Sequence, residues 1–210
     1  MRKSPRQERS RQMVENLIDA TERCIARHGL DGTTTPRVAE IAGVSVGSLY
    51  QYFGDKEALV DAVVTRQAER IGRGLRRLPL DENSTLEDIT RITVEFGVAL
   101  LSDEQGLYAE LVRNWHRLPT QRVADQLQQF FMELTTAYLL KHHRVLQMPH
   151  LQVKLFVIVN STLFTLVRLV GQNNPLITPR RVADELVAMI TGYLSAAAVE
   201  AAAEAIDQKV

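Results

Sequence analysis

The sequence predicts an all-α protein with an N-terminal three-helix domain that contains a helix-turn-helix, followed by a larger helical domain. Apolar residues recur at helical spacing along most of the chain, and no stretch has the alternating pattern of a strand. Residues that start or stop helices separate the apolar stretches. We expect a basic arm and helix-turn-helix domain over residues 1–56, a linking helix to about residue 78, and the second domain over residues 79–210.

The first expected helix covers residues 9–28, because its apolar residues share one face, and Gly29 ends it. The most informative segment follows, over residues 34–56. Thr35 can cap a short helix, and Pro36 suits its first position because the missing N–H would have no partner there. Gly43 can take the positive φ that ends this helix, and Ser45 can cap the next helix only two residues later. Helices joined so closely cross steeply, which predicts a helix-turn-helix.

The second of these helices presents small and polar residues on the side away from the expected core. If Leu49 points inward, about 100° per residue sends Gly47 and Gln51 outward, with Ser48 and Tyr50 beside them. Such a face packs poorly but suits the major groove, because glycine permits close approach, an amide can read a base edge and hydroxyls can hold phosphates. An ordinary helical hairpin with a solvated polar face is the alternative.

Local signals place the remaining helices. Asp55 can cap a helix over residues 56–78, and Ser84 with Glu87 forms a capping box for a helix over residues 84–101. Further helices are expected over residues 103–118, 119–143 and 149–170. Thr178 and Pro179 begin the last helix, which runs toward residue 206.

The run GVSVGSLYQYFGDKEAL, residues 43–59, resembles the signature of the TetR (tetracycline-repressor) family of bacterial transcription regulators, and the likeness covers about residues 10–60. It implies homodimers that read near-palindromic operator DNA, and a second domain that binds a small-molecule effector and dimerises. Tyr52 stands where many members have histidine, and Pro36 where many have a polar or basic residue, so Arg37 is our substitute for reading a base there. The implied DNA contacts are Thr35, Arg37, Val46, Gly47, Ser48, Tyr50, Gln51, Tyr52 and Lys56.

Charge is distributed unevenly, although the 210 residues have a formal net charge of zero. Residues 1–78 hold 14 basic and 10 acidic side chains, net +4, and residues 79–210 hold 11 and 15, net −4. The basic residues near the N-terminus could form an arm that reaches DNA, or a solvated tail. With no visible secretory signal and one cysteine, we expect a cytoplasmic protein. The apolar run 155–167 is too short to span a bilayer, so no membrane partner is expected.

The last two expected helices are apolar on more than one face, so each needs two partners. Two such pairs, one from each subunit, would form a four-helix bundle; a buried hairpin within a monomer is the alternative. The residues proposed for this interface are Val157, Phe164, Val187, Ile190 and Leu194.

An effector pocket is expected among the aromatic residues of the second domain, although each of them could instead be core. The candidates are Phe96, Tyr108, Trp115, His116, Phe130, Tyr138, Asn160 and Thr162. No cofactor is expected, and His142 and His143 lack the i, i+4 spacing that would place two imidazoles on one metal ion.

These inferences combine into a dimeric one-component regulator, a repressor that an effector of unknown identity releases from operator DNA. Two other classes stay open. An all-α enzyme acting on an apolar substrate lacks a supporting catalytic constellation, and an architectural DNA binder would show little preference among sequences.

Overall fold

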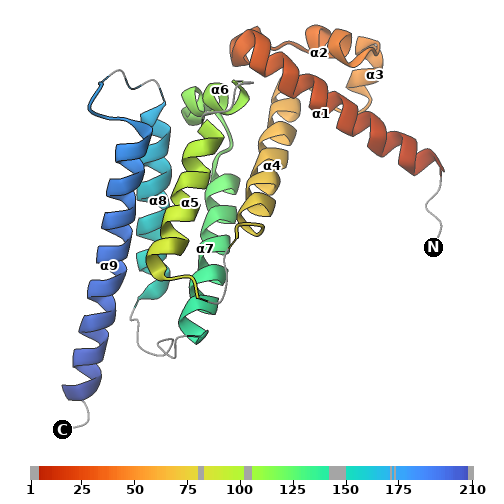
Figure 1. Ribbon diagram of the computed structural model, residues 1–210. Helices are drawn as coiled ribbons and strands as arrows, with labels where there is room; N and C mark the ends of the chain where they lie inside the picture. The colour runs from red at the N-terminus through yellow and green to blue at the C-terminus, as the bar shows by residue number, and fades with distance from the viewer. Residues whose placement is uncertain are drawn as a thin grey trace. The chain divides into compact units, whose positions relative to one another are not determined.

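The computed structural model describes residues 5–79, 83–101, 106–141, 150–170, 172 and 174–207, and all regular structure in these residues is helical (Figure 1). The expectation of an all-α fold is therefore confirmed. The helices are α1 Pro5–Gly32, α2 Thr35–Ala42, α3 Val46–Tyr50, α4 Lys56–Leu75, α5 Leu86–Leu101, α6 Leu107–Arg113, the 3₁₀ turn η1 Trp115–Arg117, α7 Gln121–Lys141, α8 Leu151–Leu169 and α9 Pro179–Asp207.

The chain divides into two compact units. The first comprises Met1–Ala68 and Ser102–Thr120, and the second comprises Glu69–Leu101 and Gln121–Val210. This division differs from the sequence-based boundaries, which assigned the whole of residues 79–210 to the second domain. Helix α6 packs against α1. Polar contacts join the same parts of the chain: the Glu110 carboxylate accepts the Leu30 N–H at 2.9 Å, and Arg117 pairs with Asp31 at 2.8 Å. Helix α6 and η1 therefore belong with the first unit.

The core of the first unit forms where α1, α2, α3 and α4 bring their apolar faces together. Leu17, Cys24, Val38, Leu49 and Leu59 are each completely buried in it. Burying a side chain of the size of leucine stabilises a fold by about 1.5–3 kcal/mol, so these contacts hold the short helices α2 and α3 in place. Neither helix is long enough to be stable alone.

Two helix starts differ by one residue from the prediction. Thr34, not Thr35, caps α2 by accepting the Arg37 N–H, so Pro36 occupies the second helical position. At α5 the capping box joins Thr85 and Asp88 in place of Ser84 and Glu87: the Thr85 N–H donates to Asp88 Oδ2 at 2.9 Å. In both places two adjacent hydroxyl residues compete for one cap, and their order in the sequence does not decide between them.

Other local signals act as predicted. Asp55 Oδ1 accepts the Ala58 N–H at 2.7 Å at the start of α4, and Thr178 Oγ1 accepts the Arg181 N–H at the start of α9. Gly29 takes a φ of 71° and breaks α1, as expected, but a helical turn resumes after it and extends to Gly32. The break leaves a kinked end on α1.

In the second unit, α5 packs against α9 and α7 against α8 (Figure 1). The buried face of α9 contacts a core to which α5 and α8 also contribute, and it includes Leu186 and Val187. Gly97 allows α5 to approach α8, because a Cβ at this position would lie 2.9 Å from Leu166 Cδ1. Close approach of these helices excludes water from an apolar core.

Candidate nucleic-acid interface

The turn between α2 and α3 has the geometry that the sequence predicts. Gly43 ends α2 in the left-handed conformation with a φ of 70°. The Val44 N–H donates to the Ala39 carbonyl at 3.0 Å and closes the turn. Ser45 then caps α3 by accepting the Ser48 N–H at 3.1 Å. The helix-turn-helix is therefore formed by local hydrogen bonds at both sides of the turn.

Helix α3 has one buried and one exposed side. Leu49 is fully buried, whereas the neighbouring Tyr50 is 51% exposed. Gly47 and Gln51 are also exposed, and a Cβ at Gly47 would meet nothing nearer than Ser45 Oγ at 3.9 Å. The backbone at Gly47 is therefore open to close approach by another molecule.

Two expected contact residues on different helices are joined to each other. Thr35 Oγ1 on α2 lies 3.1 Å from the Tyr50 hydroxyl on α3, within hydrogen-bonding distance. Thr35 is available for this contact because Thr34 provides the cap of α2. Val46 and Tyr52 are exposed beside Tyr50, and Ser48 is half-buried. These side chains form one surface on the outer side of the helix-turn-helix.

Arg37 and Lys56, which the family resemblance places at DNA, are bound to the backbone in this structure. Arg37 Nη1 donates to the Gly32 carbonyl, and Lys56 Nζ donates to the Leu30 carbonyl at 2.7 Å. Both carbonyls lie at the kinked end of α1. The sequence did not point to these contacts, although Gly29 marks the place where the helix is interrupted.

Arg66 on α4 is held in ion pairs and does not contribute free positive charge to this helix. Its side chain is 11% exposed and pairs with Glu15, Asp19 and Glu22 on α1. Burial opposes the charge of Arg66, but hydrogen bonds and charges from Glu22 and Asp19 outweigh it, so the pKa of Arg66 is raised. Arg66 therefore holds α4 to α1.

The candidate dimer residues fall into two groups. Val187, Ile190 and Leu194 are buried in the core of the second unit, so their side chains are not exposed as a partner-binding face requires. Phe164 is 63% exposed and Val157 is exposed beside it on α8. The sequence identified α8 and α9 as apolar but did not show which faces of these helices are buried within the chain.

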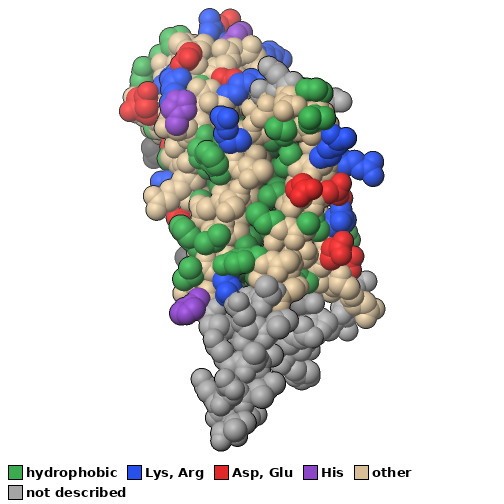
Figure 2. Space-filling view, turned by 90° about the vertical axis from the view of Figure 1, so that its left-hand side faces the viewer, with side chains coloured by type: hydrophobic (Ala, Val, Ile, Leu, Met, Phe, Trp, Pro, Cys, Tyr) green, Lys and Arg blue, Asp and Glu red, His purple; other side chains and the backbone are tan. Residues whose placement is uncertain are grey.

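The exposed face of α8 and α9 carries further apolar side chains. In Figure 2, hydrophobic side chains lie in patches along the side of the molecule where α8 and α9 run. Lys154 on α8 lies over the ring of Tyr193 on α9, with Nζ 5.3 Å from the ring centroid, so the two exposed faces are adjacent. The large hydrophobic residues exposed on the two helices are Val153, Phe156, Val157, Phe164, Met189 and Tyr193.

Helix α8 extends the apolar run that the sequence shows at residues 155–167. Among the described helices it is long and apolar enough to cross a membrane by length and composition. Core helices of globular proteins pass the same test, and Leu155, Ile158 and Val159 on α8 are buried in the second unit. The apolar character of α8 is therefore divided between this core and the exposed face.

The effector candidates are divided between the two units. Tyr108 donates from its hydroxyl to Gln67 Oε1 at 2.9 Å in the first unit, where Trp115 is half-buried and His116 is exposed. The other candidates belong to the second unit: Phe96 is half-buried, Phe130 is buried, Asn160 donates to the Phe156 carbonyl, and the Thr162 hydroxyl is buried without a hydrogen-bond partner. The side chain of Tyr138 lies outside the described residues.

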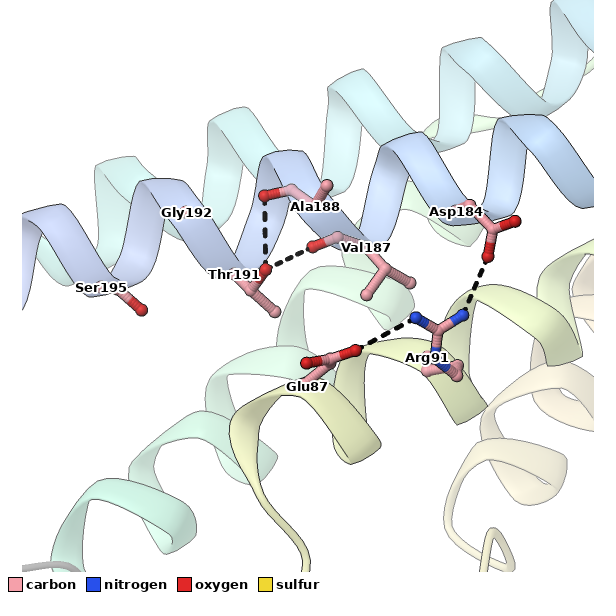
Figure 3. Close-up of a pocket in the computed structure, with 8 residues that line it drawn as sticks. All are labelled: Glu87, Arg91, Asp184, Val187, Ala188, Thr191, Gly192 and Ser195. Atoms are coloured by element: carbon pink, nitrogen blue, oxygen red, sulfur yellow. Dashed lines mark hydrogen bonds and ion pairs between the residues drawn. The ribbon is translucent and has the colours of Figure 1, made fainter.

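A groove of about 440 Å³ lies between α5 and α9 (Figure 3). Arg91 crosses it and pairs with Glu87 at 3.1 Å and Asp184 at 3.0 Å. Both carboxylates are more than half exposed, whereas ligand pockets are mostly apolar and enclosed. The remaining lining residues are Val187, Ala188, Thr191, Gly192 and Ser195. In the described part of the chain, no group of three or more His, Cys, Asp or Glu residues is placed to hold a metal ion.

A helix-turn-helix with an exposed second helix, attached to a second unit made of helices, defines a class of helical DNA-binding regulators. Residues 17–63 match the family described as bacterial regulatory proteins, tetR family. The helix-turn-helix of this chain is therefore a DNA-binding domain of the TetR family of transcriptional regulators.

Curated relatives support this assignment over part of the chain. The HTH-type transcriptional regulator BetI of Burkholderia thailandensis is 33% identical over 99 residues, 47% of this chain and 49% of BetI. The HTH-type transcriptional repressor AcnR of Corynebacterium efficiens is 34% identical over 79 residues, 37% of this chain and 42% of AcnR. The chain thus spans about half the length of the curated relatives it matches.

A solved structure extends the likeness in fold. The crystal structure of a putative TetR-family transcriptional regulator from Mesorhizobium loti has a TM-score of 0.61 and 20% sequence identity. The superposition covers 90% of this chain and 98% of that one. The second unit therefore resembles such a regulator in fold.

Proposed function

We propose that this protein is a homodimeric repressor that binds operator DNA through α3 and is released when a small molecule binds its second unit. The observation that carries the proposal is the contrast on α3 between the fully buried Leu49 and the exposed Tyr50, which is hydrogen-bonded to Thr35. The hydrogen bond orders a phenol on the surface, at a cost in side-chain entropy. An ordered, exposed aromatic beside the open backbone of Gly47 suits contact with a DNA groove.

Dimerisation is proposed because one helix-turn-helix offers few contacts for selective binding. The exposed apolar face of α8 and α9 supports a second copy as the occupant, since this face combines large hydrophobic side chains from two adjacent helices. Two copies related by twofold symmetry would present two α3 helices to the half-sites of one operator. For an effector to release the DNA, the effector-free and effector-bound conformations must differ in DNA affinity. A coupling free energy of about 1–3 kcal/mol between effector binding and DNA binding is sufficient.

The direct test measures binding to DNA from upstream of the protein's own gene by fluorescence anisotropy. At one salt concentration, a repressor is expected to prefer its operator over an unrelated duplex by roughly 10³-fold or more. Similar affinities for both duplexes with a steep salt dependence would identify an architectural binder instead. Small molecules are then screened in the same assay at constant salt concentration, and an effector is a molecule that releases the protein from the operator duplex.

Replacing Tyr50 by alanine is expected to weaken operator binding by at least tenfold. Replacing Leu176, an exposed residue in the connection between α8 and α9, is the matched control and should leave binding unchanged. Thr35→Val keeps the shape of the side chain but removes the hydrogen bond to Tyr50. Because a neutral hydrogen bond contributes about 0.5–1.5 kcal/mol, this variant should weaken binding by about two- to tenfold. Unchanged affinity in both Tyr50→Ala and Thr35→Val would contradict the assignment of this surface.

A further inference from the structure

The kinked end of α1 is a segment, residues 29–33, in which the backbone needs partners from outside the helix. Gly29 has a φ of 71° and a ψ of 171°, which interrupts the helical hydrogen bonds. The Leu30 N–H and the carbonyls of Leu30 and Gly32 bond to side chains of other helices, and the Leu30 carbonyl also accepts the Thr33 N–H at 3.3 Å. The segment leads directly into Thr34, the cap of α2.

Glu110 on α6 provides the partner for the amide. Its Oε1 accepts the Leu30 N–H at 2.9 Å and the Asn114 side-chain amide at 2.9 Å, while its Oε2 pairs with Arg113 at 3.3 Å. The Glu110 side chain is only 19% exposed. A Cβ at Gly29 would lie 3.1 Å from Oε1, so the absence of a side chain at this position leaves room for the carboxylate.

Side chains of the helix-turn-helix and of α4 meet the same segment. Lys56, at the start of α4, donates to the Leu30 carbonyl at 2.7 Å, and Arg37 of α2 donates to the Gly32 carbonyl. Leu30 is thus held by Glu110 through its N–H and by Lys56 through its carbonyl. The two basic side chains that the family resemblance assigns to DNA are therefore ordered by a segment that α6 holds.

A second polar connection joins α6 to the first unit. The Tyr108 hydroxyl donates to Gln67 Oε1 at 2.9 Å, and Gln67, which is buried, donates to Glu22 on α1. Helix α6 therefore contacts both α1 and α4 by hydrogen bonds. In the chain it lies between α5 and α7, whose residues belong to the second unit.

We propose that Glu110 is a positioning residue for operator binding: its carboxylate holds residues 29–33, and through them the side chains of Arg37 and Lys56 and the start of α2. This inference rests on the proposed function as a DNA-binding regulator. It assigns a role in DNA binding to a residue 80 positions away from Leu30 in the sequence. Loss of the carboxylate is expected to loosen the kinked segment while the core around Leu17 and Leu49 stays formed.

The test uses the full-length protein and the operator duplex that the wild-type protein selects. Glu110→Ala should weaken operator binding by about tenfold, the factor that corresponds to losing a hydrogen bond to a charged group. Hydrogen exchange followed by mass spectrometry should become faster in a peptide that contains Leu30, without a change in peptides from α3. Glu110→Gln retains an oxygen acceptor and should bind within about threefold of wild type. Arg113→Ala, which removes the exposed ion pair of the same carboxylate, is the matched control and should bind like wild type.

The possible outcomes separate this inference from the proposed function. A wild-type protein with no preferred duplex contradicts the proposed function itself. Faster exchange at Leu30 in Glu110→Ala together with wild-type operator affinity overturns the positioning role. If Glu110→Ala exchanges rapidly throughout residues 17–63, Glu110→Asp decides, because it keeps the charge but shortens the reach. Local opening of the Leu30 peptide with weaker operator binding in Glu110→Asp then supports the proposal, and unchanged affinity overturns it.

Discussion

Replacing Phe164 on α8 by aspartate is expected to dissociate the proposed dimer into monomers. Phe164 is 63% exposed in the single chain. A phenylalanine side chain buries about 150–250 Å² when fully covered, so about 100–150 Å² remain for a partner to cover. At about 25 cal/mol per Å², this area contributes roughly 3 kcal/mol from each copy and roughly 6 kcal/mol from the symmetric pair, as an upper estimate.

The substitution removes this contribution and also places a carboxylate in each half of the interface. Since about 1.4 kcal/mol corresponds to a tenfold change, the dimer dissociation constant should rise by at least roughly a hundredfold. Sedimentation velocity over a range of protein concentrations measures this change. Tyr50→Asp introduces the same charge on the exposed face of α3 and serves as the control: it should leave the dimer intact while abolishing operator binding. A Phe164→Asp protein that dimerises as tightly as wild type would refute the reasoning.

Three further predictions concern the first unit. Arg66→Met should lower the free energy of unfolding by about 3 kcal/mol in urea denaturation, because it removes the positive charge that pairs with the largely buried Glu22 carboxylate. The double change with Glu22→Leu should recover most of this loss, and equal losses in both proteins would contradict the reasoning. Gly43→Ala should lower the free energy of unfolding by about 1–2 kcal/mol. Backbone strain at a φ of 70° is the cause, because an added Cβ would meet no atom within 4 Å and so would not clash. An unchanged unfolding midpoint would count against this prediction. A hydrogen bond from Arg117 and its charge hold the pKa of Asp31 below its ordinary value of 3.8. The ion pair therefore contributes stability that is present above pH 3.8 and is lost as the pH falls through the lower pKa of the folded state. Arg117→Ala should return the pKa of Asp31 toward 3.8 in an NMR titration. A pKa that stays low in this variant would argue against the ion pair as its cause.

Errors in predicting the helices are informative about local signals. Gly43 and Ser45 were read correctly because each acts on backbone within three residues, and few other residue types can do the same. The cap of α2 was misplaced because Thr34 and Thr35 are chemically equivalent neighbours. Only the packed structure distinguishes them, since it brings Tyr50 within reach of the second hydroxyl.

The sequence by itself determined the helical class, the helix-turn-helix and the family, because these depend on periodicity and on contacts between residues close in the chain. Tertiary structure decided how the individual side chains are used. Lys56 binds the carbonyl of Leu30, and Val187 is buried in the core of the second unit whereas Phe164 is exposed. These contacts depend on which groups far apart in the sequence lie close together in space, as Glu110 and Leu30 do. The spacing of residues along one helix does not indicate which other helices it packs against.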